Sequence, residues 1–189
     1  MRIIAGNRRG ALLTKLDAAN TRPTADRVRE SLFNILQGGR FANCLDNSQV
    51  IDLFAGTGAL GLEALSRGAS FASFVEKDAT ALRVIRANIA KLRFQSTSSV
   101  IAGDAISLLQ WRGAPGNLIF ADAPYDSGGG LQAVGRLATI GAIAKSGLII
   151  IETGTSETLN TAYLEKHEIT MLDQRRYGRA LLHILKYAA

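Results

Sequence analysis

Cysteine and histidine are scarce in this chain, and long hydrophobic runs are absent. Among 189 residues, Cys44 is the only cysteine, and His167 and His183 are the only histidines. The sequence therefore excludes a disulfide framework and a cysteine-based zinc cluster, and it argues against a dedicated transition-metal site. No apolar run approaches the roughly 20 residues that span a bilayer, and no signal peptide opens the chain. We expect a soluble, cytoplasmic protein that holds no metal ion and binds no membrane.

The positive charge is concentrated in one part of the chain. The formal net charge is +6, and residues 1–40 contain eight basic and three acidic side chains, so the remainder is nearly neutral. Seven of the eight basic residues are arginine, whose planar guanidinium group suits phosphate oxygens. A basic lobe on a neutral body predicts a nucleic acid partner, although a solvated basic surface without a ligand would have the same composition.

Residues 49–76 carry the most informative pattern. A short apolar run, 50–54, predicts a strand buried on both faces, and Gly56-Thr57-Gly58-Ala59-Leu60-Gly61 follows it directly. An amphipathic helix and a second apolar strand, 71–75, then lead to Glu76. Glycines allow a tight turn close to a ligand, the helix N-terminus offers free N–H groups, and the acid can accept both hydroxyls of a ribose. The pattern predicts a nucleoside-binding site; the alternative is a glycine-rich packing turn.

The rest of the chain alternates between predicted strands and helices. A hairpin over 1–15, with Arg8 and Arg9 at its exposed tip, precedes a helix that has Thr24 as its N-cap and ends at Gly38-Gly39. Gly128-Gly129-Gly130 is expected to form a flexible loop. Further helices are expected over 78–92, 105–111, 131–143 and 157–165, and further strands over 99–102, 117–121, 147–151, 167–173 and 180–186. Such alternation predicts a parallel, doubly wound sheet that binds ligands at the carboxyl ends of its strands.

Four acidic residues stand at the ends of predicted strands, namely Asp52, Glu76, Asp104 and Asp122. An acid at a strand end is usually only a solvated loop residue. The carboxyl ends of parallel strands share one edge of the sheet, so we expect all four acids to lie along one rim beside the glycine turn.

The segment Asp122-Ala123-Pro124-Tyr125 is the best candidate for chemistry. Pro124 restricts the residue before it and thereby directs the Ala123 carbonyl. Asp122 and this carbonyl can accept the two hydrogens of an exocyclic amine, and Tyr125 can stack on the ring. The segment therefore suits a flat heterocycle with an exocyclic amine; the alternative is an ordinary Pro-Tyr turn with a solvated Asp122.

The segments IDLFAGTGALGLEALSRGA, VEKD, GDA and DAPY, in this order and spacing, resemble the class I S-adenosylmethionine-dependent methyltransferases. Together with RIIAGNRRG and TRPTADRVRESLFNIL, the chain resembles the RsmD family, which methylates exocyclic N2 of one guanine in 16S ribosomal RNA. The resemblance implies a Rossmann-like, seven-stranded, mostly parallel sheet with an antiparallel last strand. It also implies a basic N-terminal hairpin and helix (1–40) that binds RNA, joined to a methyltransferase domain (41–189).

The resemblance also implies roles for individual residues. The methionine part of S-adenosylmethionine would contact Phe54, Ala55, Gly56, Thr57 and Gly58, with Asp52 near its amino group. Glu76 would hold the ribose hydroxyls, Asp104 and Ala105 would flank the adenine, and S-adenosylhomocysteine would be the product. The catalytic residues would be Asp122, Ala123, Pro124 and Tyr125. Ala123 departs from the family, which has proline there, but the required group is a backbone carbonyl, so we expect activity to survive.

RNA would be held through phosphates by Arg8, Arg9, Arg22, Arg27 and Arg29, with an affinity that falls steeply in salt. The expected partner is 16S ribosomal RNA or a small-subunit assembly particle, and the expected oligomeric state is a monomer. Three other functions fit parts of the sequence: a nicotinamide dehydrogenase, a DNA adenine-N6 methyltransferase, and a non-catalytic RNA-binding or assembly protein.

Overall fold

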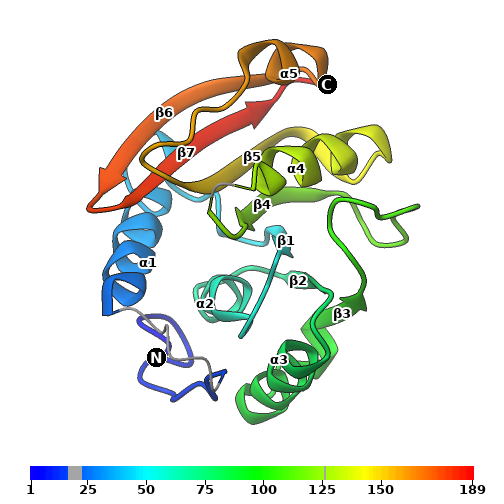
Figure 1. The fold of residues 1–189 in the computed structure, drawn as a ribbon. Helices are drawn as coiled ribbons and strands as arrows, with labels where there is room; N and C mark the ends of the chain where they lie inside the picture. The colour runs from blue at the N-terminus through cyan, green and yellow to red at the C-terminus, as the bar shows by residue number, and fades with distance from the viewer. Residues whose placement is uncertain (17–22, 126) are drawn as a thin grey trace.

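The computed structural model describes residues 1–16, 23–125 and 127–189. Seven strands form one sheet in the order β3-β2-β1-β4-β5-β7-β6 (Figure 1). Strands β1 to β5 are parallel, and β7 runs antiparallel to both β5 and β6. The predicted seven-stranded, mostly parallel sheet with an antiparallel last strand is therefore confirmed. The strands are β1 (Gln49–Leu53), β2 (Phe71–Glu76), β3 (Ser98–Ala102), β4 (Gly116–Asp122), β5 (Ile143–Gly154), β6 (Ile169–Tyr177) and β7 (Ala180–Tyr187).

Helices cover both faces of the sheet (Figure 1). Helices α1, α2 and α3 pack on one face, and α4 and α5 pack on the other. The helices are α1 (Pro23–Leu36), α2 (Ala59–Ser66), α3 (Ala79–Leu92), α4 (Gly129–Thr139) and α5 (Thr161–Lys166), with 3-10 turns η1 (Gly39–Phe41) and η2 (Gln95–Thr97). None of the helices within the described ranges is long and apolar enough to cross a membrane.

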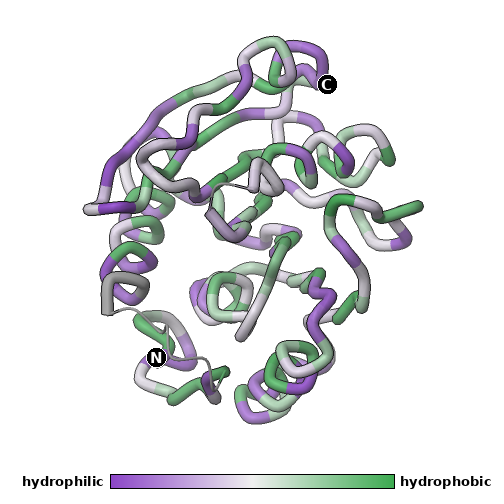
Figure 2. Tube along the Cα trace, viewed as in Figure 1, coloured by the Kyte–Doolittle hydropathy of each residue, from purple (hydrophilic) through white to green (hydrophobic). Residues whose placement is uncertain are grey.

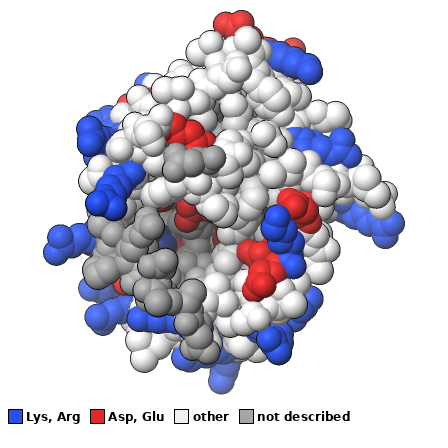
Figure 3. All heavy atoms as spheres, in the orientation of Figure 1, with Lys and Arg blue, Asp and Glu red and all other residues white. Residues whose placement is uncertain are grey.

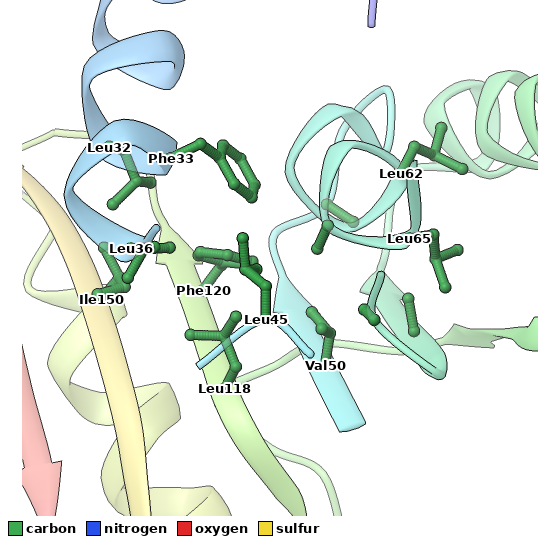
Figure 4. Close-up of a cluster of buried hydrophobic side chains, with 14 of the residues drawn as sticks. Leu32, Phe33, Leu36, Leu45, Val50, Leu62, Leu65, Leu118, Phe120 and Ile150 are labelled. Carbon is green, nitrogen blue, oxygen red and sulfur yellow. The ribbon is translucent and has the colours of Figure 1, made fainter. Parts of the chain in front are cut away.

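Successive residues of the central strands feed two separate hydrophobic cores. Val50 belongs to the core under α1 to α3, and its neighbour Ile51 belongs to the core under α4 and α5. This division follows from the strand period of two and explains why hydrophobic residues predominate in the central strands (Figure 2). In the first core, Phe33 and Leu36 point from α1 toward β4 (Figure 4), and the rings of Phe33 and Phe120 lie 5.7 Å apart.

The N-terminal segment is tied to the main body through buried polar groups. The predicted hairpin is present, but its pairing is a single bridge between Arg2 and Leu12. The Glu63 carboxylate on α2, which is fully buried, accepts the N–H groups of Ile4 at 2.7 Å and Ala5 at 3.0 Å. The buried side chain of Ile3 joins the core under α1 to α3. The division of the chain near residue 40 stays a prediction.

The strand register decides which residues meet at the carboxyl edge. Leu53, the last residue of β1, pairs with Ala121 of β4, so the glycine turn after β1 begins beside the end of β4. Asp122 pairs with Glu152 of the neighbouring β5. On the other side of β1, Glu76 at the end of β2 pairs with Ala102. The edge is therefore continuous across five strands.

Several predicted elements are wrong. The segment 105–111 is a loop, held by the Arg136 guanidinium, which donates to the carbonyls of Leu108 and Leu109. A segment this short gains few hydrogen bonds as an isolated helix. Gly129 and Gly130 begin α4 instead of forming a loop, and they pack closely against the side chains of Ser127 and Ile151, respectively. Helix α1 begins at Pro23, so Thr24 lies inside the helix and is not its N-cap.

Candidate active site

A cavity of about 1100 Å³ opens at the carboxyl edge of the sheet. It is lined from both halves of that edge, by residues that follow β2 and β3 and by residues that follow β4 and β5, including Glu76, Asp104, Ala105, Asp122, Tyr125 and Glu152. The space-filling view shows a hollow near the middle of this face with acidic side chains at its margin (Figure 3). Three of the four acids expected to share one rim, Glu76, Asp104 and Asp122, line this cavity; the fourth, Asp52, does not, because it lies within β1 and is buried.

The turn after β1 brings its backbone close to this cavity. Phe54, Gly56 and Gly58 all have positive φ, at +57°, +55° and +78°, which is the left-handed region that favours glycine. A side chain at Gly56 would meet only the Phe54 carbonyl at 3.9 Å, so the turn leaves open space there. Gly58 instead packs against Leu62 and Phe74 and caps α2.

A smaller cavity of about 190 Å³ lies beside this turn. Its lining includes Asp52, Phe54, Ala55, Gly56 and Thr57, five of the six residues predicted to contact the methionine part of the cofactor, while Gly58 is not among its lining residues. Phe54, Asp122 and Glu152 line both cavities, together with Met1 and Val28. The two spaces therefore adjoin.

Glu76 is fixed by the main chain around it. One carboxylate oxygen accepts the Gly56 N–H at 2.8 Å, and the other accepts the N–H groups of Lys77 and Asp78, both at 2.8 Å. The glycine turn and the acid, twenty residues apart in sequence, are thus directly bonded. This geometry holds the carboxylate against the cavity before any ligand arrives.

Asp52 is buried beneath the glycine turn. Its carboxylate accepts the Gly61 N–H in the first turn of α2 at 2.9 Å. Burial raises the pKa of Asp52 to about 8; the Gly61 hydrogen bond opposes this shift, and the nearby Asp122 and Glu76 carboxylates add to it. An opposite charge placed in the small cavity would relieve both the burial and the repulsion. The position is therefore suited to a cationic group.

Asp104 follows β3 on the far side of the cavity. The Lys77 ammonium lies 3.0 Å from its carboxylate, and the Ile106 N–H donates to it at 3.1 Å. These hydrogen bonds hold the pKa of Asp104 below its usual range. Ala105 beside it is buried and lines the cavity. A carboxylate and an apolar surface at this point suit an adenine ring and its exocyclic amine.

The segment after β4 forms the opposite wall. Asp122 is exposed at the strand end, Ala123 is buried, and the half-buried Tyr125 donates its hydroxyl to Glu152 at 2.7 Å. Pro124 lines the cavity beside them. The four predicted acceptor residues are therefore brought together within one cavity.

Glu152 completes this wall and was not among the predicted site residues. The sequence placed it at the end of a strand, as it did the four acids predicted to share the rim. Its contact with Tyr125 and its pairing with Asp122 depend on which strand lies beside β4. Only the sheet order could have assigned it to the site.

The predicted RNA-binding arginines fall in different environments. Arg9 and Arg27 are exposed. Arg8 donates to the Leu92 carbonyl at the end of α3 at 2.8 Å, and its guanidinium lies over the Phe94 ring. Arg22 lies outside the described residues.

Arg29, one of the arginines predicted to hold RNA phosphates, is buried. Its side chain is 5% exposed, donates to the Arg2 carbonyl at 2.8 Å and pairs with Asp26 at 3.2 Å. The apolar stripe of α1 turns this position toward the body of the protein. Arg29 lines the small cavity, where it joins Asp52 and Asp122. Its charge therefore acts inside the molecule.

No group of three or more histidine, cysteine or acidic side chains in the described part of the chain is arranged to hold a metal ion.

Comparisons with known proteins agree with this architecture. The family model described as Conserved hypothetical protein 95 matches residues 1–186. Ribosomal RNA small subunit methyltransferase D of Escherichia coli (strain K12) is 38% identical over 161 residues, covering 85% of this chain and 78% of that protein. The protein of the same name from Haemophilus influenzae is 34% identical, with 85% and 82% covered. The solved structure of yhhF from Escherichia coli superposes with a TM-score of 0.85 at 34% identity, covering 100% and 98% of the chains.

Proposed function

This chain belongs to the conserved hypothetical protein 95 family, the RsmD family, and on that premise we propose that it methylates exocyclic N2 of a guanine in 16S ribosomal RNA, with S-adenosylmethionine as the methyl donor. The names of its relatives support ribosomal RNA of the small subunit as the substrate. The choice of guanine N2 and of the donor is argued from the residues at the carboxyl edge.

The observation that carries the proposal is a single cavity with two chemically different walls. One wall comes from Phe54 at the start of the glycine turn, Glu76 and Asp104, and the other from Asp122, Tyr125 and Glu152. A reaction between a nucleoside-type cofactor and a flat base needs both ligands in contact, within about 3–3.5 Å of each other at the reacting atoms. A shared cavity supports the proposal because it can hold both ligands side by side.

The residues of the first wall fit S-adenosylmethionine. Glu76 would accept the ribose hydroxyls, Asp104 and Ala105 would contact the adenine, and Asp52 would face the methionine ammonium group. The open space over Gly56 leaves room for the methionine part against the backbone. When bound, this cofactor supplies a methyl group activated by a cationic sulfur.

The residues of the second wall favour guanine over adenine. The Watson–Crick edge of guanine presents two kinds of donor, the ring N1–H and the N2 amine, whereas adenine presents an acceptor at N1. Asp122 and the Ala123 carbonyl would accept the amine hydrogens, and Glu152 would accept the N1–H. Two carboxylates side by side would repel the adenine N1 lone pair. Tyr125 would stack on the ring.

Asp122 is the proposed catalytic residue. Hydrogen bonds from N2 to Asp122 and to the Ala123 carbonyl would draw the N2 lone pair out of ring conjugation and aim it at the methyl group. N2 becomes cationic as its bond to the methyl carbon forms and the carbon–sulfur bond breaks. The Asp122 carboxylate is attracted more strongly to that cation than to the neutral amine, and it then takes the N2 proton.

The test uses small-subunit RNA and small-subunit particles from a strain that lacks the protein, incubated with purified protein and labelled S-adenosylmethionine. We expect N2-methylguanosine on nucleoside analysis, and a loss of rate of about 10²–10⁴-fold in Asp122→Asn. Glu165→Gln, which removes a carboxylate on the exposed surface of α5, is the matched control and should retain activity.

Four outcomes would count against the proposal. Methylation of adenine N6 in DNA would favour the DNA methyltransferase, and calorimetric binding of NAD without S-adenosylmethionine would favour the dehydrogenase. Undiminished methyl transfer by Asp122→Asn would remove the catalytic role of this carboxylate. Binding of RNA without any transfer by the wild-type protein would indicate an assembly protein, with Ala123 as a mark of lost activity.

A further inference from the structure

The turn between β6 and β7 carries the sequence Arg175-Arg176-Tyr177-Gly178-Arg179, called here the hairpin tip. Tyr177 ends β6 and pairs with Ala180, the first residue of β7, so Gly178 and Arg179 form the turn itself. Gly178 has φ of +61°, which a two-residue hairpin turn commonly requires. The tip projects from the edge of the sheet near α1 (Figure 1) and is hydrophilic (Figure 2).

The hairpin tip borders the wall of the cavity that Asp122, Tyr125 and Glu152 form, called here the acceptor wall. Tyr177, Gly178 and Arg179 line the large cavity together with Asp122, Tyr125 and Glu152. The register explains this, because Leu182 of β7 pairs with Glu152 of β5, and β7 leads back from there to the tip. The turn therefore faces the same space as the residues proposed to hold the base.

The three arginines of the tip differ in whether an acidic side chain pairs with them. Arg175 pairs with Asp173 at 2.9 Å, an acid that Arg40 also approaches at 3.4 Å. Arg176 donates to the Gly178 carbonyl at 3.2 Å, and neither Arg176 nor Arg179 forms an ion pair with any described residue. Both side chains are exposed. Within the described part of the chain, two arginines without an acidic partner therefore stand at the hairpin tip, and one of them, Arg179, lines the cavity.

The positive charges of the tip can counter the negative charge of the cavity. The cavity is lined by the carboxylates of Glu76, Asp104, Asp122 and Glu152, which would repel a polyanion. Positive side chains near the cavity would offset part of that repulsion, and Figure 3 shows lysine and arginine side chains at the left margin of this face and, mixed with acidic ones, to the right of the hollow. Guanidinium groups fit phosphate oxygens through two parallel hydrogen bonds, and a neighbouring aromatic ring offers a surface for a base.

We propose that the hairpin tip binds the RNA strand next to the target guanine, with Arg176 and Arg179 on flanking phosphates and Tyr177 against a flanking base. The proposal rests on the proposed function, because it takes the acceptor wall to hold a flipped base of RNA. It adds a second RNA contact, at the far end of the sequence from the basic segment 1–40.

The experiment compares two double variants that each remove two positive charges. Arg176→Ala/Arg179→Ala alters the tip, and Lys145→Ala/Lys186→Ala removes exposed charges where β5 begins and β7 ends, at the opposite edge of the sheet. Binding of a small-subunit RNA fragment is titrated at several salt concentrations. The tip variant should weaken RNA binding about tenfold or more and reduce the log–log salt slope by about 1.4, since each single-strand phosphate contact contributes about 0.7.

Further measurements separate the tip from the active site. The tip variant should keep the wild-type affinity for S-adenosylhomocysteine, and its rate at saturating RNA should be unchanged. Tyr177→Ala should weaken RNA binding about tenfold, and Tyr177→Phe should restore it because the ring remains. The affinity for S-adenosylhomocysteine verifies the fold of each variant.

The outcomes distinguish the two proposals. If the wild-type protein neither binds nor methylates RNA, the proposed function fails. If it does both and the tip variant has the same salt slope as the lysine control, only the contact at the hairpin tip is overturned. A tip variant that loses affinity for small-subunit particles but not for naked RNA would also overturn it, because the partner would then be an acidic protein surface.

Discussion

The two halves of the carboxyl edge hold their carboxylates in different ways. In the half formed by β1 to β3, main-chain N–H groups bind the acids: Gly61 binds Asp52, Gly56 binds Glu76, and Ile106 binds Asp104. In the half formed by β4 and β5, a hydrogen bond between two side chains takes part, in which the Tyr125 hydroxyl donates to Glu152.

This difference separates a preorganised half from an adjustable half. Carboxylates fixed by backbone groups cannot turn away, which suits a cofactor that is the same in every cycle. A carboxylate fixed by another side chain can change partner when a base enters, because each side chain has its own rotamers. The first half should therefore respond to mutation mainly through cofactor affinity, and the second mainly through rate and base selectivity.

Glu76→Ala should have the largest effect on cofactor binding. It removes the acceptor for the ribose hydroxyls and leaves the Gly56 N–H without its carboxylate, so affinity for S-adenosylhomocysteine should fall about 100-fold by calorimetry. Glu76→Gln keeps an oxygen for the Gly56 N–H, so its affinity for S-adenosylhomocysteine should fall only about tenfold. A loss of affinity below threefold in Glu76→Ala would contradict the comparison, since the carboxylate fixed by backbone groups would then contribute nothing to cofactor binding.

Asp52→Asn tests whether a buried acid is kept for the cofactor at a cost in stability. Asparagine retains an acceptor for the Gly61 N–H but cannot become charged, so we expect cofactor affinity to fall about tenfold while the melting temperature rises by about 2–8 °C near neutral pH. Differential scanning calorimetry and cofactor titration measure the two effects. Loss of both affinity and stability would indicate a purely structural role for Asp52.

The same residue predicts a pH dependence. The folded protein keeps the Asp52 proton up to a pKa of about 8, whereas the unfolded chain releases it at about pH 3.9, the usual pKa of an aspartate. The unfolded state therefore binds fewer protons across this window, and the contribution of Asp52 to stability falls as pH rises from about 4 to 8. Asp52→Asn should lack this slope. Cofactor affinity should rise toward pH 8 in the wild type, because ionised Asp52 then pairs with the methionine ammonium.

Tyr125→Phe should have the smallest effect of this series. It keeps the ring for stacking but removes the hydroxyl that holds Glu152. We therefore expect the rate to fall about three- to tenfold while the cofactor affinity stays unchanged. Discrimination between guanine and 2-aminopurine in an RNA fragment should also decline. Tyr187→Phe is the control, because Tyr187 lies at the end of β7 away from the hairpin tip. A change in cofactor affinity would erase the distinction between the two halves.

The cofactor half was predictable from the sequence because its parts are close in the chain. Strand, glycine turn, helix and acid occupy residues 49–76, and the bond between Gly56 and Glu76 joins neighbours across one strand pair. The acceptor segment 122–125 was found for the same reason. The loop at 105–111 was missed because a short helical pattern does not reveal that Arg136 on α4 will bind its carbonyls.

Charge shows the limit of such inference most directly. Composition counted Arg29 with the RNA-binding arginines, but the packing of α1 buries it beside Asp26. Arg8 is likewise engaged at the end of α3. The arginines of the hairpin tip carried no predicted role, yet Arg179 lines the cavity. A count of charges cannot tell whether an arginine is buried, bonded to the main chain or placed at the cavity, because this depends on what the side chain contacts in the folded protein.

The sequence alone determined the alternation of strands and helices, the glycine turn after the first strand, and the segment 122–125 as a candidate site. These features are local, since hydrophobic period, glycine conformation and the effect of proline act within a few residues. Only the tertiary structure decided that Glu152 stands beside Asp122, that Arg29 is internal, and that the hairpin tip borders the cavity. Those facts follow from which strands become neighbours and how α1 packs, and both are set by the packing of the whole chain.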